Sequence, residues 1–317
     1  MKKKWGTHPD MCHADDLFSS GTLLIIYGKD GIEFIRTRNT DILDKCEGKH
    51  DVGNVYNNET CEYDHHQPGG AGIRENKIPY ASFGLIWKHY GIQACGGDAE
   101  AAEIVECRIV QQIDAADNGK DLAKPIFKGV YPYVVSEMIY RFNPLWDDED
   151  QDYNKAFENA LEITLMILKR EIEVAKAEVR GYNRIVRPAI KTSQFNGNDK
   201  RLIILEESCP WREVITKEAP DALFVVFPDE SEGWRIQGIS KINGSFKLRK
   251  SLPNNWAGLN NKKLAAITGV KDAVFCHRSR FIAGTKSREG ILTLAQMALE
   301  YQKPSIPRWL LEKINSI

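Results

Sequence analysis

The order of apolar and polar positions in the first third of the chain alternates between helical and strand-like patterns. Apolar residues at helical spacing predict a helix over residues 14–27, which ends at Gly28 because glycine commonly terminates helices. Residues 32–37 alternate in the manner of a strand, and a strand is predicted there. Further short strands are expected around residues 51–53 and 62–64, and further helices near residues 80–90 and 98–113. Strands that alternate with helices favour an α/β fold with a parallel sheet, whose functional loops lie at the carboxyl ends of the strands.

The most regular pattern in the chain covers residues 153–186. Apolar residues recur there every three or four positions, which predicts one long helix with a continuous apolar seam. The seam consists of Phe157, Leu161, Leu165, Leu168, Ile172, Ala175, Val179, Tyr182 and Val186. The helix is expected to end at Pro188, because proline cannot continue the hydrogen-bonding pattern. The seam fits either a dimerising coiled coil or a connector helix packed on its own domains, and the new domain-like segment after the proline favours the connector.

The last third of the chain has strand and helix patterns of its own. Apolar runs predict buried strands over residues 201–205 and 223–228. Residues 234–237 and 246–248 are expected to pair as a hairpin, and a helix is expected over residues 288–301.

A chain of 317 residues is long enough for two domains with substantial cores. We therefore expect an α/β protein in three parts. These are an N-terminal domain over residues 1–150, a connector helix over residues 151–190 and a smaller α/β C-terminal domain over residues 191–317.

Composition restricts the compartment in which the protein works. No stretch approaches the roughly 18 apolar residues that a membrane-spanning helix needs. The basic start, Met1-Lys2-Lys3-Lys4, leads directly into a histidine cluster and leaves no room for a secretory leader. The seven cysteines are odd in number and show no C-x-x-C spacing, which is typical of free thiols in a reducing compartment. A cytoplasmic protein without membrane contact is the expectation.

The net charge of −1 hides an asymmetry along the chain. Residues 231–317 carry 15 Lys and Arg against 5 Asp and Glu, whereas the preceding residues carry 28 against 39. A basic C-terminal part behind an acidic N-terminal part suggests a polyanion that one part holds and the other processes. Uneven charge on two solvated surfaces is the alternative that charge alone leaves open.

Histidine and aspartate are concentrated near the N-terminus. Four of the seven His lie in two short clusters, His8 with His13 and His65 with His66. Asp15 follows the first cluster, where a strand end and a helix start would aim the side chains into one loop cavity. Asp and neutral His together suit Mn²⁺, Fe²⁺, Co²⁺ or Zn²⁺ better than Mg²⁺ or Ca²⁺, which prefer oxygen ligands alone. The neighbouring Asp16 is not needed as a ligand, because it could simply charge the first helical turn favourably.

Two further aspartates could complete such a site. Asp51 stands at an expected strand end before Val52-Gly53, from where its carboxylate could reach a cleft and bridge two ions. Taken alone, this tripeptide is also a common turn. Asp117 lies in the run Asp114-Ala-Ala-Asp-Asn-Gly at a helix end, which is read equally well as a helix stop.

Several of these motifs together resemble a known group of enzymes, the DHH phosphoesterase superfamily, and within it the Myg (melanocyte proliferating gene) family of metal-dependent 3′–5′ exonucleases. The resemblance covers nearly the whole chain in the right order. It rests on Thr7-His8, His13-Ala14-Asp15-Asp16, Arg36-Thr37-Arg38, Asp51-Val52-Gly53, Tyr63-Asp64-His65-His66-Gln67, Asp114, Asp117-Asn118-Gly119 and Phe281-Ile282-Ala283-Gly284-Thr285-Lys286-Ser287-Arg288-Glu289-Gly290.

The resemblance implies a DHH-like N-terminal domain with a pair of divalent metal ions in its cleft. The implied ions are Mn²⁺, with Co²⁺, Fe²⁺, Zn²⁺ or Mg²⁺ as alternatives. It further implies that Asp51 bridges them, that His66 lies beside the scissile phosphate, and that Asp64 orients a neighbouring histidine. One ion would be held by His8, His13 and Asp51, and the other by Asp15, Asp51, His65 and Asp117.

Substrate-binding residues follow from the same resemblance. They are Arg36, Arg38, Gly284, Thr285, Lys286 and Arg288. The last four lead into a helix with Ser287 as its N-cap, so that backbone N–H groups could face a phosphate; a plain capped helix is the alternative.

The chain departs from the family pattern in two places. His13 stands where the superfamily usually has Asp, and Thr285 stands where the Myg family usually has His. His277 could take over from the missing histidine, or could lack any such role.

The predicted function is a two-metal phosphodiesterase, an exonuclease acting in the 3′–5′ direction on single-stranded RNA or DNA. One alternative is a hydrolase of small phosphoesters such as dinucleotides or pyrophosphate. Another is a non-catalytic nucleic-acid-binding protein with a structural metal. The apolar seam also leaves a homodimer open.

Overall fold

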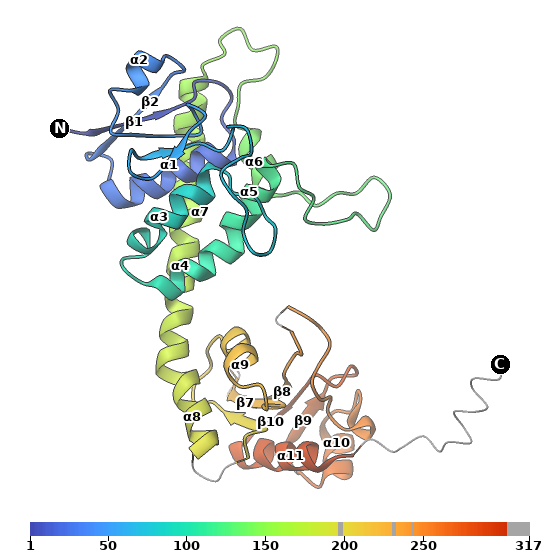
Figure 1. The fold of residues 1–317 in the computed structure, drawn as a ribbon. Helices are drawn as coiled ribbons and strands as arrows, with labels where there is room; N and C mark the ends of the chain where they lie inside the picture. The colour runs from blue at the N-terminus through green and yellow to red at the C-terminus, as the bar shows by residue number, and fades with distance from the viewer. Residues whose placement is uncertain (196–198, 230–232, 243, 303–317) are drawn as a thin grey trace. The chain divides into compact units, whose positions relative to one another are not determined.

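The fold was analysed in a computed structural model that describes residues 1–195, 199–229, 233–242 and 244–302 (Figure 1). The chain divides into two compact units, Met1–Val179 and Arg180–Ile317. Each unit is built on one five-stranded sheet accompanied by helices. The expected mixed α/β class is confirmed.

The sheet of the first unit is mainly parallel. Its strands are β1 (Lys3–Thr7), β2 (Ile32–Arg36), β3 (Gly48–His50), β4 (Tyr56–Asn57) and β5 (Glu62–Tyr63), in the order β2-β1-β3-β5-β4. The pairs β1–β2, β1–β3 and β3–β5 are parallel, and only the edge strand β4 is antiparallel to its neighbour. The carboxyl ends of β1, β3 and β5 therefore meet at one edge of the sheet.

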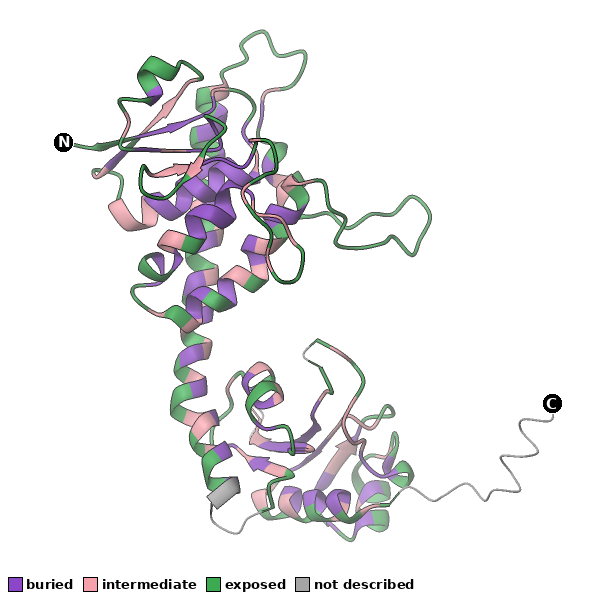
Figure 2. Ribbon diagram, viewed as in Figure 1, coloured by how far each residue is buried: buried purple, intermediate pink, exposed green. Residues whose placement is uncertain are grey.

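Helices complete the first unit. They are α1 (Ala14–Tyr27), α2 (Thr40–Leu43), α3 (Ser82–Ala94), α4 (Ala99–Val105), α5 (Gln111–Asp117), α6 (Val135–Tyr140) and α7 (Tyr153–Gly181), with a π-helical segment (Glu106–Val110) between α4 and α5. Helix α1 has the bounds that the sequence predicts, and the N–H of Gly28 donates to the carbonyl of Leu24 at its end. Figure 2 shows buried residues concentrated in α1 and α3, so these helices form the centre of the unit.

The apolar seam of α7 is buried within the chain, apart from half-buried Leu165. Phe157 packs edge-on against Phe34 of β2, with ring centroids 6.1 Å apart. The predicted end of the helix at Pro188 is wrong. A π-helical segment (Tyr182–Val186) is followed by α8 (Arg187–Phe195), and Pro188 therefore lies in the first turn of α8, where a missing N–H is tolerated.

The second unit has a mixed sheet. Its strands are β6 (Leu202–Ile204), β7 (Phe224–Pro228), β8 (Trp234–Gly238), β9 (Ala273–Cys276) and β10 (Ile282–Thr285), in the order β6-β7-β8-β10-β9. The pair β6–β7 is parallel and the other pairs are antiparallel. The predicted pairing of residues 234–237 with 246–248 is wrong, because β7 and β10 occupy both edges of β8. Residues 246–248 contribute one isolated bridge, between Ser240 and Leu248.

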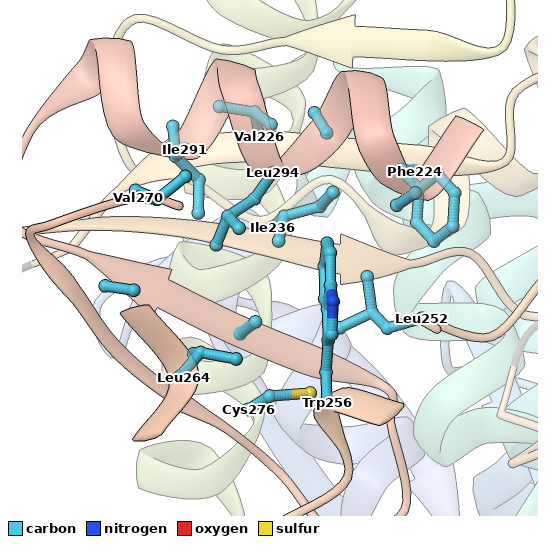
Figure 3. Packing of buried hydrophobic residues seen from close by; sticks show 14 of the residues in the cluster. Phe224, Val226, Ile236, Leu252, Trp256, Leu264, Val270, Cys276, Ile291 and Leu294 are labelled. Carbon is cyan, nitrogen blue, oxygen red and sulfur yellow. The ribbon is translucent and has the colours of Figure 1, made fainter. Parts of the chain in front are cut away.

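The helices of the second unit are α8, α9 (Arg212–Glu218), a 3₁₀ turn (Asn254–Trp256), α10 (Asn261–Thr268) and α11 (Arg288–Glu300). Ile291 and Leu294 of α11 belong to the main core cluster together with Val226 and Ile236 of the sheet, and Trp256 joins the same cluster (Figure 3). The helix expected over residues 288–301 is confirmed as α11.

In the described part of the chain, no helix combines the length and apolarity that crossing a membrane requires.

Two glycines of the first unit allow a matched test of how closely its strands and helices pack. A Cβ at Gly48 would lie 2.6 Å from the ring of Trp5, which is 2% exposed and stacked on Tyr63 and therefore cannot move aside. A Cβ at Gly21 would meet Thr164 at an ordinary 3.6 Å. We expect Gly48→Ala to lower the free energy of unfolding by about 1–3 kcal/mol. Gly21→Ala should leave it unchanged or raise it by up to about 1 kcal/mol, because alanine favours helix.

Urea denaturation followed by circular dichroism measures both changes. Equal stability of the Gly48→Ala variant and the unaltered protein would contradict the close packing of β3 beneath Trp5.

Candidate metal centre

Three strands of the first sheet deliver side chains to one place. β1 ends at Thr7 and is followed by His8, β3 is followed by Asp51, and β5 is followed by Asp64 and His65. All four side chains are buried, with at most 9% of the residue exposed. Because the three strands are parallel neighbours, residues far apart in sequence meet at the carboxyl edge of the sheet.

Two helix ends supply the remaining side chains. His13 is the N-cap of α1, and Asp15 and Asp16 lie in the first turn of that helix. Asp117 is the last residue of α5. The structure thus brings all six predicted metal ligands to one cluster: His8, His13, Asp15, Asp51, His65 and Asp117.

Asp51 lies at the centre of the cluster. Its Oδ2 is 3.1 Å from Nε2 of His13 and 3.3 Å from Nε2 of His8. Its Oδ1 is 3.5 Å from Nδ1 of His66 and 3.7 Å from Nε2 of His65. Each carboxylate oxygen therefore faces a different pair of histidines. Asp51 has φ +54°, a conformation rare for a residue with a Cβ, which marks a constrained position.

Asp15 and Asp117 form a second group around His65. Nε2 of His65 is 3.1 Å from Oδ2 of Asp117 and 3.9 Å from Oδ2 of Asp15. The other oxygen of Asp117 is 3.3 Å from Nδ1 of His13, which links this group to the first.

The structure adds Asp16, which the sequence analysis left out of the site. Its Oδ2 is 3.5 Å from Nε2 of His8, and its Oδ1 accepts the backbone N–H of His13 at 2.8 Å. Asp16 therefore stabilises the helix start, as expected, and also belongs to the cluster. In the sequence, a favourable charge in the first turn of the helix is a sufficient explanation for Asp16. No sequence signal therefore pointed to its contact with His8.

Many polar atoms of the cluster are buried without a hydrogen-bond partner. They include both ring nitrogens of His8, Nδ1 of His13, Oδ2 of Asp16, Oδ2 of Asp51 and Nε2 of His65. Such atoms are costly to bury unless something compensates them. His8, His13 and Asp16 form one group whose ligand atoms could share a metal ion, as do Asp51 with His65 and His66, and Asp15 with His65 and Asp117. Nitrogen and carboxylate oxygen donors suit Mn²⁺, Fe²⁺, Co²⁺ and Zn²⁺, so the residues present fit a transition-metal ion.

The carboxylates also control the protonation of the histidines. Burial alone would lower the pKa of His13, but the carboxylates of Asp16 and Asp51 outweigh it and raise this pKa well above the ordinary value. Burial is likewise outweighed at His65, where the close carboxylates of Asp117 and Asp51 raise the pKa to about 11. Without a metal ion, positive charge in the cluster is therefore supplied by protonated histidine.

Burial has different outcomes for the two central aspartates. It raises the pKa of Asp15 well above the usual value, assisted by the neighbouring charges of Asp117 and Asp51. Burial would also raise the pKa of Asp51, but the adjacent rings of His13 and His65 hold that pKa well below its usual range. Asp51 is thus the carboxylate that stays ionised.

Asp15 and Asp114 are both fixed by the start of α3. Asp15 accepts the backbone N–H groups of Ser82 at 3.0 Å and Phe83 at 2.7 Å. Asp114 accepts the N–H of Gly84 at 2.9 Å and pairs with Arg74 at 2.7 Å. Asp114 therefore connects α5 to α3, and only Asp15 continues into the cluster.

His66 and Asp64 form a hydrogen-bonded pair at the cluster. Nδ1 of His66 lies 2.7 Å from Oδ1 of Asp64, which also accepts the backbone N–H of His65 and that of His66. The hydrogen bond to Asp64 is the largest effect on His66 and raises its pKa. The His66 side chain is 55% exposed, so its ring can meet a ligand from solvent.

A cavity of about 380 Å³ opens onto the cluster, lined by residues that include His8, His13, Asp51, Asp64 and His66. Arg38 also lines this cavity and donates to Asp10 at 2.6 and 2.9 Å. The guanidinium of Arg36, in contrast, donates to the carbonyls of Tyr153 and Asp10, within its own unit.

The predicted substrate-binding residues of the second unit lie at the start of α11. Gly284 and Thr285 end β10, and the Ser287 hydroxyl caps α11 by accepting the N–H of Gly290. The carboxylate of Asp272 accepts the N–H of Ser287 at 2.7 Å, so this helix end already has an anion from its own chain.

Three other residues of this region contact their own unit. Arg288 pairs with Glu206 at 2.6 Å, and the N–H of Lys286 donates to the carbonyl of Asp272. His277 accepts the N–H of Ser279 through Nδ1 and lies against Phe281. Their roles in substrate binding remain predictions.

The sequence analysis also missed Asn143, which lies just after α6. Its Oδ1 accepts the N–H of Cys12 at 2.9 Å, and its Nδ2 donates to the carbonyl of Cys12 at 2.7 Å. The side chain of Asn143 thus binds both the N–H and the carbonyl of Cys12, which lies between His8 and His13. An isolated Asn 131 positions downstream carries no sequence signal for this contact.

The fold and the cluster define an α/β protein whose first unit gathers His and Asp side chains that could bind metal ions. The family model of the MYG1 exonucleases, described as an uncharacterised protein family (UPF0160), matches residues 4–299. The chain belongs to this family, which confirms the Myg assignment made from the motifs.

Relatives match along nearly their whole length. The "MYG1 protein" of Dictyostelium discoideum is 29% identical over 326 residues, which cover 96% of this chain and 98% of the relative. The "MYG1 exonuclease" of Homo sapiens is 27% identical over 328 residues, covering 96% and 87%. That of Mus musculus is 26% identical over 327 residues, covering 95% and 86%. No solved structure matches the chain significantly.

The contacts of Asn143 generate a prediction about stability. We expect Asn143→Ala to lower the free energy of unfolding by about 1–3 kcal/mol, because it leaves two buried backbone groups of Cys12 without partners. Asn76→Ala, which removes an exposed amide bonded to Gln111, should change it by no more than about 0.5 kcal/mol. Chemical denaturation of both variants measures the difference, and equal stability would show that Asn143 does not hold the loop.

Proposed function

We propose that the chain is a metal-dependent phosphodiesterase of the DHH type, an exonuclease that removes nucleotides from single-stranded RNA or DNA in the 3′–5′ direction. The observation that carries the proposal is the buried carboxylate of Asp51, whose two oxygens face two different pairs of histidines. The exonuclease names of mammalian relatives support the same reading.

In this proposal the cluster holds two divalent ions, with Mn²⁺ as the preferred metal and Co²⁺, Fe²⁺, Zn²⁺ or Mg²⁺ as substitutes. One ion would be held by His8, His13 and Asp51, with Asp16 beside it, and the other by Asp15, Asp51, His65 and Asp117. When bound, such a pair supplies a nucleophile at neutral pH and positive charge that stabilises phosphodiester hydrolysis.

The chain's own residues would orient the substrate. The carboxylate of Asp64 fixes the ring of His66 through Nδ1, which leaves Nε2 to donate to a phosphate oxygen. Because Asp64 also raises the pKa of His66, the ring carries a positive charge over a wider pH range than a free histidine. His66 would therefore bind the scissile phosphate and share the negative charge that develops on it.

More distant phosphates would be bound by cations away from the cluster. Arg38 lines the cavity and could exchange its exposed partner Asp10 for a phosphate. Gly284, Thr285, Lys286 and Arg288, with the basic C-terminal part over residues 191–317, would hold the strand, while residues 151–190 connect it to the catalytic part over residues 1–150. Arg36 would act by fixing the loop that carries Asp10.

A second candidate is the hydrolysis of small phosphoesters. The cavity of about 380 Å³ favours it, because a dinucleotide or pyrophosphate needs no larger space.

One experiment separates these functions. The purified protein with Mn²⁺ should release mononucleotides stepwise from single strands carrying a label at the 5′ end, giving a ladder that shortens from the 3′ end. Circular single strands should survive, because an exonuclease needs an end. Asp51→Asn should abolish turnover by about a thousandfold or more while the circular dichroism spectrum stays unchanged, because both ions lose the ligand they share.

Asp30→Asn is the matched control, because Asp30 is exposed in the turn between α1 and β2 and lies outside the cluster and its cavity. It should keep most of the activity. Rapid cutting of circles would identify an endonuclease, and cleavage confined to dinucleotides or pyrophosphate would identify the second candidate.

A second prediction concerns pH. In the metal-free protein the carboxylates keep His13 and His65 protonated, so a metal ion must displace protons to bind. The affinity for Mn²⁺ should therefore rise with pH, by about tenfold per pH unit for each proton displaced, between about pH 6 and pH 8.

Calorimetric titrations with Mn²⁺ in buffers of different ionisation enthalpy count the released protons directly. An affinity that does not depend on pH, with no proton release, would mean that the ion binds elsewhere.

A further inference from the structure

Residues 120–134, between α5 and α6, form a segment without buried positions. Every residue in it is exposed, and Figure 2 shows it as a continuous exposed loop that projects from the helices of the first unit. Ile126 is 87% exposed, Phe127 68%, Tyr131 71% and Tyr133 67%. Contiguous exposed apolar and aromatic side chains of this size mark an interaction surface.

The segment has a defined shape. The carbonyl of Phe127 accepts the N–H of Val130 at 3.2 Å, and Gly129 has φ +78°, which makes a tight turn at Lys128-Gly129. Pro125 and Pro132 favour extended backbone on either side of this turn. The aromatic rings are thus presented on two extended arms.

The segment lies between two elements that contribute to the candidate site, α5 and α6. It follows Asp117, whose carboxylate belongs to the cluster. It leads into α6, where the hydroxyl of Tyr140 donates to the sulfur of Met11 at 3.3 Å, and Tyr140 lines the cavity over the cluster. The segment is therefore joined, through Asp117 on one side and α6 on the other, to elements that contribute to the cluster and to its cavity.

Lysines accompany the rings: two precede Phe127, and Lys128 lies between Phe127 and Tyr131. Lys120, Lys124 and Lys128 oppose a single acidic residue, Asp121, within the segment. Surfaces that bind other proteins are depleted in lysine, whereas aromatic rings with interleaved cations are typical of surfaces that bind single-stranded nucleic acids.

We propose that residues 120–134 bind the unpaired bases of a single-stranded nucleic acid by stacking on Phe127, Tyr131 and Tyr133, while the lysines contact its phosphates. This inference deepens the proposed function. It rests on that function for the path of the strand, which would run from the segment into the cavity. The segment would add affinity for strands longer than the cavity can hold, and would add none for dinucleotides.

The test measures binding without catalysis. The full chain in EDTA is titrated into a fluorescein-labelled single strand of about 12 nucleotides, within the usual size range of such sites, and anisotropy is recorded. Phe127→Leu, Tyr131→Leu and Tyr133→Leu should each weaken binding by about fivefold or more, which corresponds to the roughly 1 kcal/mol minimum for one stacked base. Phe127→Tyr should retain affinity, because it keeps the ring.

Two further variants complete the design. Lys128→Ala should reduce the salt dependence of binding by about 0.7 units of log–log slope, the value for one phosphate contact to a single strand. Met166→Ala, an equally exposed apolar change on α7, should have no effect.

The experiment distinguishes failure of this binding inference from failure of the proposed nuclease function. Ring-dependent binding by a protein that cleaves nothing would sustain this inference and reject the nuclease. Unchanged affinity after all three ring substitutions would overturn the inference, even if the protein is a nuclease. A wild-type dimer that the ring substitutions convert to a monomer, with unchanged affinity for the strand, would show that a second copy covers the segment instead.

Discussion

The arrangement of the first unit depends on one buried carboxylate, that of Asp51. Its neighbours His8 and His13 come from β1 and the start of α1, and its neighbours His65 and His66 follow β5. A single ionised group thus links the ends of three strands and a helix. Because four histidines share the two oxygens, moving any of these elements leaves a buried polar group without compensation, which explains why so much secondary structure converges here.

Backbone N–H groups at two helix starts donate hydrogen bonds to the buried aspartates of the cluster. Asp15 accepts two N–H groups at the start of α3, and Asp16 accepts one at the start of α1. The positive ends of two helices therefore face the carboxylates and offset part of the cost of burying them. The offset is incomplete, because the pKa of Asp15 is still raised by burial and by Asp117. A cation would remove the remainder.

The sequence predicted the cluster well because strand ends in parallel sheets are informative. His8, Asp51 and His65 lie just after the ends of β1, β3 and β5, and parallel neighbours bring such positions together. Asp16 was missed because its favourable charge in the first helical turn was a sufficient explanation. Asn143 was missed because its contact with Cys12 depends on tertiary packing alone. The proline rule failed at Pro188 for a local reason, because a π-helical segment precedes the residue and places it in the first turn of α8, where a missing N–H is tolerated.

A buried, constrained cluster is suited to chemistry on a phosphate and poorly suited to recognising a chain of nucleotides. The candidate ligand atoms lie within 4.8 Å of one another in each group, and the cavity above them has a volume of about 380 Å³. Under the proposed function, this cavity would hold the reacting phosphate and one or two nucleosides. Discrimination between a short and a long substrate must therefore come from outside the cluster. The exposed residues 120–134 connect α5, which ends at Asp117 of the cluster, to α6 and contribute no buried core, so they can vary in their contacts without disturbing the cluster. Catalysis would then depend on the cluster, which must be rigid. Recognition of substrate length would depend on residues 120–134 of the same unit, which must be accessible.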